Sequence, residues 1–218
     1  MGEIIVAPSI LAADFADFAG AVSEIRAAAA DWVHVDVMDG HFVPNLTFGP
    51  QLIADLGKRG PAFFDVHLMV ERPEKFIPAF AAAGAGCISF HVEAAADSVE
   101  MLKSITKLGV KAGISISPET PAALLADALP YCDLALVMTV HPGYGGQTLI
   151  PHCLEKVREI AAMREQAGLN FTISADGGIH EGNAGELVAA GADVLVLGSA
   201  FFKAADKAAL VRILKKLK

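Results

Sequence analysis

The amino-acid sequence predicts an α/β fold, a (β/α)₈ barrel of the TIM type in which residues 1–218 form a single domain. Three observations support this prediction. Short apolar segments alternate eight times with segments of helical periodicity. Glycine and alanine recur where a helix should end and the next strand begin, as expected of helix C-caps. Polar residues suited to catalysis follow the ends of the apolar segments, where barrel enzymes gather their functional groups.

The expected strands are short and rich in β-branched residues, and each precedes a segment with helical spacing. We expect strands at 4–11, 32–38, 62–70, 87–93, 111–117, 134–140, 171–175 and 194–197. We expect helices at 14–30, 52–56, 73–84, 97–108, 123–129, 151–166 and 183–190, and a final helix that ends in 215–218. Eight such units fit a closed barrel better than an open doubly wound sheet, which usually has five or six strands.

Prolines, glycines and acidic residues indicate where these elements begin and end. Asp14 opens the alanine-rich first helix, and Pro73 suits the first turn of the third. Pro118 and Pro121 lead from the fifth strand into the fifth helix, and glycine-rich turns follow the last three strands. The lysines within 215–218 complement the C-terminal end of the last helix dipole, so they need no nucleic-acid partner to explain them.

Composition limits the classes of partner. The chain has 54% hydrophobic and 19% charged residues, enough apolar surface for a core, and a formal net charge of −8. We therefore expect neither nucleic acid nor a membrane as partner, and no apolar run approaches the roughly 20 residues of a membrane span. The odd set Cys87, Cys132 and Cys153 lacks CxxC spacing, which argues against a disulfide framework and favours the reducing cytoplasm. We also expect a homo-oligomer.

Two strands carry side chains able to bind metal. Because strand side chains alternate between faces, His34 and Asp36 share the face opposite to the neighbouring valines, and His67 repeats this pattern in the next strand. Together with Asp176 they offer two imidazole nitrogens and two carboxylates, a set suited to Zn²⁺, Fe²⁺, Mn²⁺ or Co²⁺. The alternative is that each histidine is a hydrogen-bonded core residue. The other five lack this paired register and are weaker candidates: His41, His91, His141, His152 and His180.

Glycine-rich turns predict phosphate binding. Gly177-Gly178 and Gly198-Ser199 follow the seventh and eighth strands, where barrels often bind phosphate through backbone N–H groups. Gly143-Tyr144-Gly145-Gly146 adds more backbone donors in a loop expected to be mobile. A glycine-rich turn by itself is common between helices and strands, so only the shared location of these turns supports a phosphate site.

These motifs together resemble those of the ribulose-phosphate 3-epimerase family over nearly the whole chain. The resemblance rests on Ser9, His34-Val35-Asp36-Val37-Met38-Asp39-Gly40, Asp65-Val66-His67-Leu68-Met69, His91-Val92-Glu93, Pro142-Gly143-Tyr144-Gly145-Gly146-Gln147 and Asp176-Gly177-Gly178. It implies a barrel that binds one divalent metal per chain and interconverts D-ribulose 5-phosphate and D-xylulose 5-phosphate.

The resemblance also implies roles for individual residues. His34, Asp36, His67 and Asp176 become the metal ligands, and Asp36 and Asp176 also the acid–base pair. The implied substrate contacts are Ser9, His67, Gly143, Tyr144, Gly145, Gly146, Gly177, Gly178, Gly198 and Ser199. Inverting C3 beside a ketone requires a carboxylate on each face, and a metal on the enediolate oxygens stabilises their negative charge. Met38, Met69 and Met138 are expected to line this region.

Three positions depart from the family pattern, and two other functions compete. Relatives more often carry Asn or Glu at His141, Phe at Tyr144 and an acidic residue at Ser174, which leaves D-allulose 6-phosphate as an alternative substrate. A metal-free aldolase or decarboxylase would need a lysine at a strand end, but Lys111 begins its strand at the opposite rim. A non-catalytic phosphate-binding barrel is the other alternative.

Overall fold

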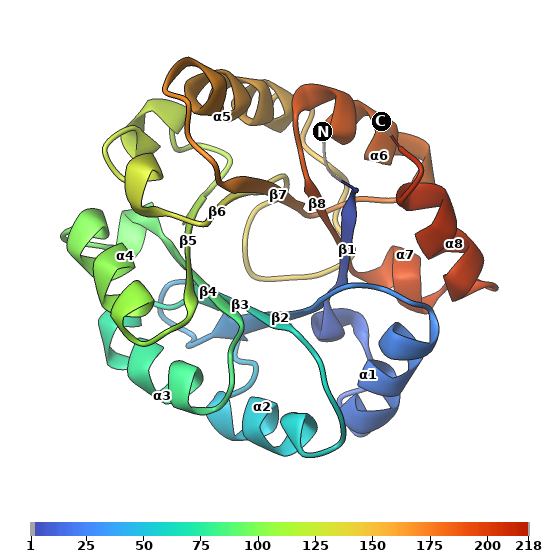
Figure 1. Cartoon of the computed structure of the whole chain (residues 1–218). Coiled ribbons are helices and arrows are strands. Elements are labelled where there is room, and N and C mark those ends of the chain that lie inside the picture. Colours follow the sequence, from blue (N-terminus) through green and yellow to red (C-terminus); the bar gives the residue numbers. More distant parts are fainter. Residues whose placement is uncertain (1–2, 218) are drawn as a thin grey trace.

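The computed structural model describes residues 3–217, and these form the predicted barrel. Eight parallel strands run in the order β1-β8-β7-β6-β5-β4-β3-β2 around the ring in Figure 1. Between β1 and β2, the ring closes through a parallel bridge that pairs Ser9 with His34 and through backbone N–H groups of Asp31 and Trp32 that donate to the Val6 carbonyl. The strands are β1 Ile5–Pro8, β2 Val33–Met38, β3 Phe64–Met69, β4 Cys87–His91, β5 Lys111–Ile116, β6 Leu134–Met138, β7 Thr172–Asp176 and β8 Val194–Leu197.

Helices surround this ring (Figure 1). They are α1 Phe18–Ala27, α2 Pro50–Gly57, α3 Ile77–Ala82, α4 Ser98–Lys107, α5 Cys153–Gln166, α6 Glu181–Ala190, α7 Ser199–Phe202 and α8 Lys207–Leu214. The N-cap residues of α1, α4 and α8 are Asp17, Asp97 and Asp206, and each accepts a backbone N–H of its helix through its side chain. Within residues 3–217, no helix has both the length and the hydrophobicity needed to cross a bilayer.

Two expected helices are corrected by the structure. The segment expected to be helical at 123–129 forms two 3₁₀ turns, Ala122–Leu125 and Leu129–Tyr131. The expected helix spans only seven residues, and Pro130 has no backbone N–H to donate to the Ala126 carbonyl, so the segment cannot extend into a longer and more stable α-helix. The helix expected at 73–84 is a 3₁₀ turn, Pro73–Lys75, followed by α3. The short helix α7, directly after β8, was not predicted.

The predicted alternation of strand faces is confirmed. Val33, Val35 and Val37 of β2 point outward and join the large apolar core between the sheet and the helices. The inward faces of β1, β4, β6 and β8 supply a second cluster that includes Leu134 and Leu136 of β6. Because one face of β2 is used for packing, its other face can carry His34, Asp36 and Met38 into the barrel.

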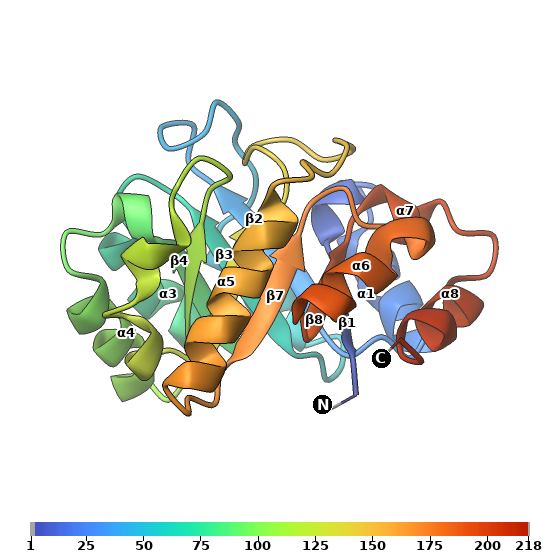
Figure 2. The same cartoon turned by 90° about the horizontal axis from the view of Figure 1, so that it is seen from above.

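Two long loops stand above the same rim of the barrel, after β2 and after β6 (Figure 2). The amide of Asn45 donates to the carbonyl of Gly143 at 2.8 Å, and the Tyr144 hydroxyl donates to the carbonyl of Pro44 at 2.8 Å. These two hydrogen bonds join segments about 100 positions apart in the chain and hold the loops together over the mouth of the barrel.

Candidate active site

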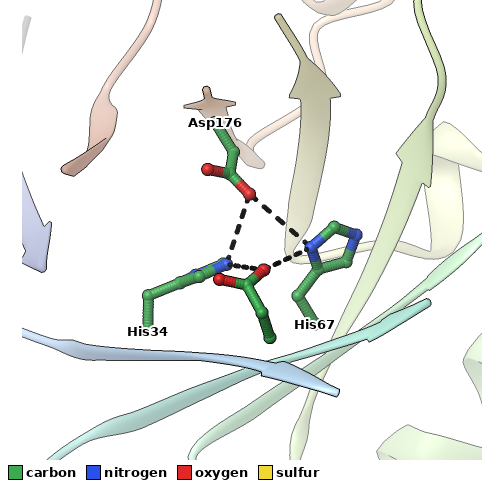
Figure 3. Close-up of side chains that lie close together, drawn as sticks. His34, His67 and Asp176 are labelled. Atoms are coloured by element: carbon green, nitrogen blue, oxygen red, sulfur yellow. Dashed lines mark hydrogen bonds and ion pairs between the residues drawn. The ribbon is translucent and has the colours of Figure 1, made fainter. Parts of the chain in front are cut away.

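Four predicted ligands come together at the centre of the barrel (Figure 3). The His34 Nε2 atom lies 3.3 Å from Asp36 Oδ1 and 3.5 Å from Asp176 Oδ2. The His67 Nδ1 atom lies 3.3 Å from Asp36 Oδ1 and 3.6 Å from Asp176 Oδ2. One donor atom from each residue lies within 4.8 Å of all the others. The sequence prediction that these residues form one group is therefore matched by their geometry.

Strand register explains this convergence. In the parallel pair β2 and β3, Asp36 is opposite His67, and both side chains point inward. Asp176 is the last residue of β7, on the other side of the ring in Figure 1. A carboxylate therefore reaches the centre from each of two opposite walls. This arrangement cannot arise from neighbours in sequence, since it needs the barrel to close.

Charge compensation holds this buried group together. His34 and His67 are fully buried, and Asp36 and Asp176 are 4% and 8% exposed. Burial opposes ionisation of Asp36, but His34 and His67 outweigh it and hold the Asp36 pKa well below its usual range. Burial also lowers the pKa of His34, but Asp36 and Asp65 raise it well above 6.5. The two carboxylates thus require positive charge beside them.

The four side chains are oriented by a surrounding set of hydrogen bonds. The carboxylate of Asp65, also fully buried, lies 2.8 Å from His34 Nδ1, so it accepts that N–H and leaves Nε2 facing the group. The Ser9 hydroxyl donates to Asp36 Oδ2 at 2.5 Å. On the far side of His67, its Nε2 atom lies 3.0 Å from His91 Nε2.

A cavity of about 280 Å³ opens above Asp36 and Asp176 toward the loops. The expected methionines Met38, Met69 and Met138 line it. Of the expected substrate contacts, these line the cavity: Ser9, Gly143, Tyr144, Gly145, Gly146, Gly177, Gly178, Gly198 and Ser199. His67, which was also expected to contact substrate, does not line the cavity and is fully buried. Its Nδ1 atom faces the carboxylates of Asp36 and Asp176.

One end of the cavity suits an anion, and one of its residues was missed by the sequence analysis. Gly177 and Gly178 have φ of +122° and +66°, a left-handed backbone that glycine adopts without strain. Gly198 and Ser199 lie at the start of α7 in the same lining. Lys203, exposed, also lines the cavity. The sequence signal was its spacing of four from Ser199, but only lysines at strand ends were considered.

The three departures from the family pattern lie in different settings. The Tyr144 hydroxyl is used in the hydrogen bond between the two loops. His141 is exposed, with Nδ1 3.3 Å from Glu119. Ser174 is fully buried, and its hydroxyl has no hydrogen-bond partner among the described residues. None of the three belongs to the group of four.

The remaining histidines were rated as weaker ligand candidates, and within residues 3–217 none joins the group of four. His41 Nδ1 and His152 Nε2 contact backbone carbonyls, and His180 caps α6 through Gly182 while also lining the cavity. His91 touches His67 from outside the group.

Comparison with known proteins gives a consistent match. Residues 5–202 match the model of a family described as "Ribulose-phosphate 3 epimerase family". A protein of Treponema pallidum named ribulose-phosphate 3-epimerase is 49% identical over 197 residues, 90% of each chain. A protein of the same name from Synechocystis is 45% identical over 94% of this chain and 90% of its own. A mutant tryptophan synthase α-subunit from Pyrococcus furiosus, 13% identical, superimposes with a TM-score of 0.69 over 100% and 99% of the two chains.

Proposed function

Because the chain belongs to the ribulose-phosphate 3-epimerase family, we propose that it interconverts D-ribulose 5-phosphate and D-xylulose 5-phosphate by acid–base catalysis at C3. One observation carries this proposal: the carboxylates of Asp36 and Asp176 reach the base of one cavity from opposite walls of the barrel. Epimerisation needs this arrangement, since the proton must leave one face of C3 and return to the other.

Asp36 and Asp176 perform the proton transfers. One carboxylate accepts the C3 proton, the C–H electrons move into a C2–C3 double bond, and the C2 carbonyl becomes an oxyanion. The other aspartate, carrying a proton, delivers it to the opposite face of C3. In the reverse direction the two exchange roles. Hydrogen bonds orient the pair, since the Ser9 hydroxyl holds the second oxygen of Asp36.

The donor set fits a divalent cation. Two carboxylates and two imidazole nitrogens converge within 4.8 Å, and two buried negative charges need compensation that a divalent ion provides while both imidazoles stay neutral. His34, Asp36, His67 and Asp176 would hold it, and Asp65 and His91 would orient the two imidazoles. Bound there, a divalent ion would supply Lewis-acid stabilisation of the negative charge of the enediolate.

The rest of the cavity positions the substrate. Gly177-Gly178, Gly198-Ser199 and Lys203 suit the phosphate, which places the sugar carbons toward Asp36 and Asp176. The methionine side chains exclude water from the reacting carbon. The loop containing Gly143 to Gly146 covers the cavity, and its Tyr144 hydroxyl is already bonded to Pro44. The proton of that hydroxyl is therefore not free to be donated to the additional hydroxyl of D-allulose 6-phosphate, which supports the five-carbon substrate.

Steady-state kinetics test the substrate. We expect kcat/KM for D-ribulose 5-phosphate to exceed that for D-allulose 6-phosphate by at least tenfold, or about 1.4 kcal/mol of transition-state discrimination. A tenfold preference for the six-carbon sugar would contradict the substrate and leave the acid–base mechanism intact.

Metal analysis tests the donor set. Protein purified without chelator should contain about one divalent ion per chain, and His67→Ala should lower metal content and activity together. Full activity after exhaustive chelation would refute the ligand assignment.

Two further expectations belong to this proposal. Cys87, Cys132 and Cys153 are free thiols, which supports a reducing cytoplasmic setting. Homo-oligomerisation is a prediction that light scattering on the purified protein would test.

A further inference from the structure

Two buried or partly buried side chains, His91 and Glu93, lie behind the proposed ligand His67, and neither takes part in the proposed proton transfers. The Nε2 atoms of His67 and His91 are 3.0 Å apart, and the His91 Nδ1 atom is 3.1 Å from Glu93 Oε2. The two rings are inclined by only 27°, with centroids 5.0 Å apart, as suits a hydrogen bond between ring edges. We call this chain of contacts the His67–His91–Glu93 relay.

The donors and acceptors of these contacts determine which ring nitrogens of the relay carry a proton. A carboxylate only accepts, so the His91 Nδ1 atom facing Glu93 must carry the proton. His91 is fully buried, which favours its neutral form, so its Nε2 has a free lone pair. That lone pair accepts the N–H of His67, so Nε2 of His67 carries a proton, and a His67 that binds metal in its neutral form has its lone pair on Nδ1. The Nδ1 lone pair of His67 therefore points at Asp36 and Asp176.

We propose that Glu93, acting through His91, is a positioning residue that selects the His67 tautomer able to bind a divalent cation through Nδ1. This inference rests on the proposed metal site, and it adds Glu93 and the His67 tautomer to the orienting role of His91. Asp65 does the same for His34 in one step, because it contacts His34 Nδ1 directly at 2.8 Å. His67 presents the opposite nitrogen, and an additional imidazole lies between it and its carboxylate.

Glu93 is itself held in a fixed orientation. Its Oε1 atom accepts the backbone N–H of Ser117 at 2.8 Å and the hydroxyl of Thr120. Its Oε2 atom faces His91. The Ser117 hydroxyl also lies near His91, with its oxygen 3.4 Å from His91 Nδ1. The Phe42 ring packs against His91 with centroids 4.7 Å apart. The two oxygens of Glu93 thus have separate partners.

This separation makes Glu93→Gln a sharp test. The backbone N–H of Ser117 can only donate, so the glutamine oxygen must remain on that side and its NH₂ group must face His91. His91 Nδ1 must then accept, its proton moves to Nε2, and His67 Nε2 has to accept in turn. The proton of His67 is forced onto Nδ1, where it blocks the lone pair needed for the metal.

The experiment combines zinc affinity with NMR. In chelator competition, Glu93→Gln should weaken Zn²⁺ binding by about 10–100-fold, the usual cost of losing an outer partner of a metal-ligating histidine. His91→Phe, which keeps the ring but removes both nitrogens, should weaken binding similarly. His91→Gln places an amide oxygen near the Nε2 position, so we expect an affinity within about threefold of the unmutated protein. The charge control is Glu119→Gln, an exposed glutamate of the loop that carries Ser117 and Thr120, which should have no effect.

¹⁵N NMR of the histidine rings in metal-free protein at neutral pH provides the second readout. We expect the Nδ1–H tautomer of His91 in the unmutated chain and the Nε2–H tautomer in Glu93→Gln. An Nε2–H tautomer of His91 in the unmutated chain would overturn the relay, as would Zn²⁺ affinity of Glu93→Gln within twofold of the unmutated protein. If the unmutated protein binds no Zn²⁺, the proposed metal site fails, while the His91 tautomer still decides whether the relay exists.

Discussion

Gly178 connects the phosphate end of the cavity to the loop that covers it, and Gly178→Ala is expected to damage both stability and substrate binding. The residue has φ of +66°, which costs an L-amino acid about 1–2 kcal/mol. An added Cβ would overlap the backbone nitrogen of Leu149 and lie 2.9 Å from the Gln147 carbonyl oxygen. Both obstacles are backbone atoms, so the overlap should add about 1–3 kcal/mol of overpacking.

Gly109→Ala separates these two contributions. Gly109 has a similar φ of +77°, but an added Cβ there meets no atom within 4 Å. We therefore expect Gly109→Ala to lower the free energy of unfolding by about 1–2 kcal/mol, and Gly178→Ala by about 2–5 kcal/mol. Urea denaturation followed by circular dichroism measures both. Gly178→Ala should also raise KM, because it displaces the loop at 147–149, whereas Gly109→Ala should not. Equal destabilisation by the two variants would refute the close contact between Gly178 and this loop.

Three other predictions concern single side chains. Lys203→Met should raise KM for the sugar phosphate about tenfold with little change in kcat, and this KM increase should shrink at high salt; an unchanged KM would remove Lys203 from the phosphate site. Tyr144→Phe removes one hydrogen bond between the loops after β2 and β6, worth about 0.5–1.5 kcal/mol, and should raise KM several-fold in steady-state assays. An unchanged KM would show that this hydrogen bond does not hold the two loops over the cavity. Burial lowers the pKa of His91 from 6.5 to about 4 in the folded chain. As the pH falls from 6.5 toward 4, His91 therefore binds a proton in the unfolded chain but not in the folded one, and this lowers the free energy of unfolding. His91→Phe has no such group, so between pH 6.5 and 4 its free energy of unfolding, measured by urea denaturation without metal, should rise relative to that of the unmutated protein. A difference in unfolding free energy between the two proteins that does not change with pH would contradict the lowered pKa.

The centre of the site was predictable because strand periodicity is strict. Alternation in β2 and β3 places His34, Asp36 and His67 on the inward face, and the parallel register then sets Asp36 beside His67. Asp176 was predictable as well, because it ends a strand whose carboxyl end must meet the same rim. These inferences need only the fold class and the period of a strand.

Other features depend on side-chain rotation and loop paths, which sequence periodicity does not encode. The sequence could not indicate that His34 presents Nε2 to the group while His67 presents Nδ1. It also did not indicate that the Tyr144 hydroxyl, a departure from the family pattern, donates to the Pro44 carbonyl of the other loop. Lys203 was missed because it follows α7, a short helix that was not predicted, and only lysines at strand ends were considered.

The central proposal is that Asp36 and Asp176 exchange protons with C3 from opposite faces, and solvent deuterium incorporation tests it most directly. In D₂O, the unmutated protein should place deuterium at C3 of D-ribulose 5-phosphate and D-xylulose 5-phosphate. Asp36→Asn and Asp176→Asn should each slow epimerisation in both directions by about 10²–10⁴-fold. Variants that retain metal are the informative ones, because loss of the ion alone would also reduce activity. Absence of deuterium at C3 during epimerisation, or near-normal turnover in either metal-loaded variant, would contradict the two-aspartate mechanism.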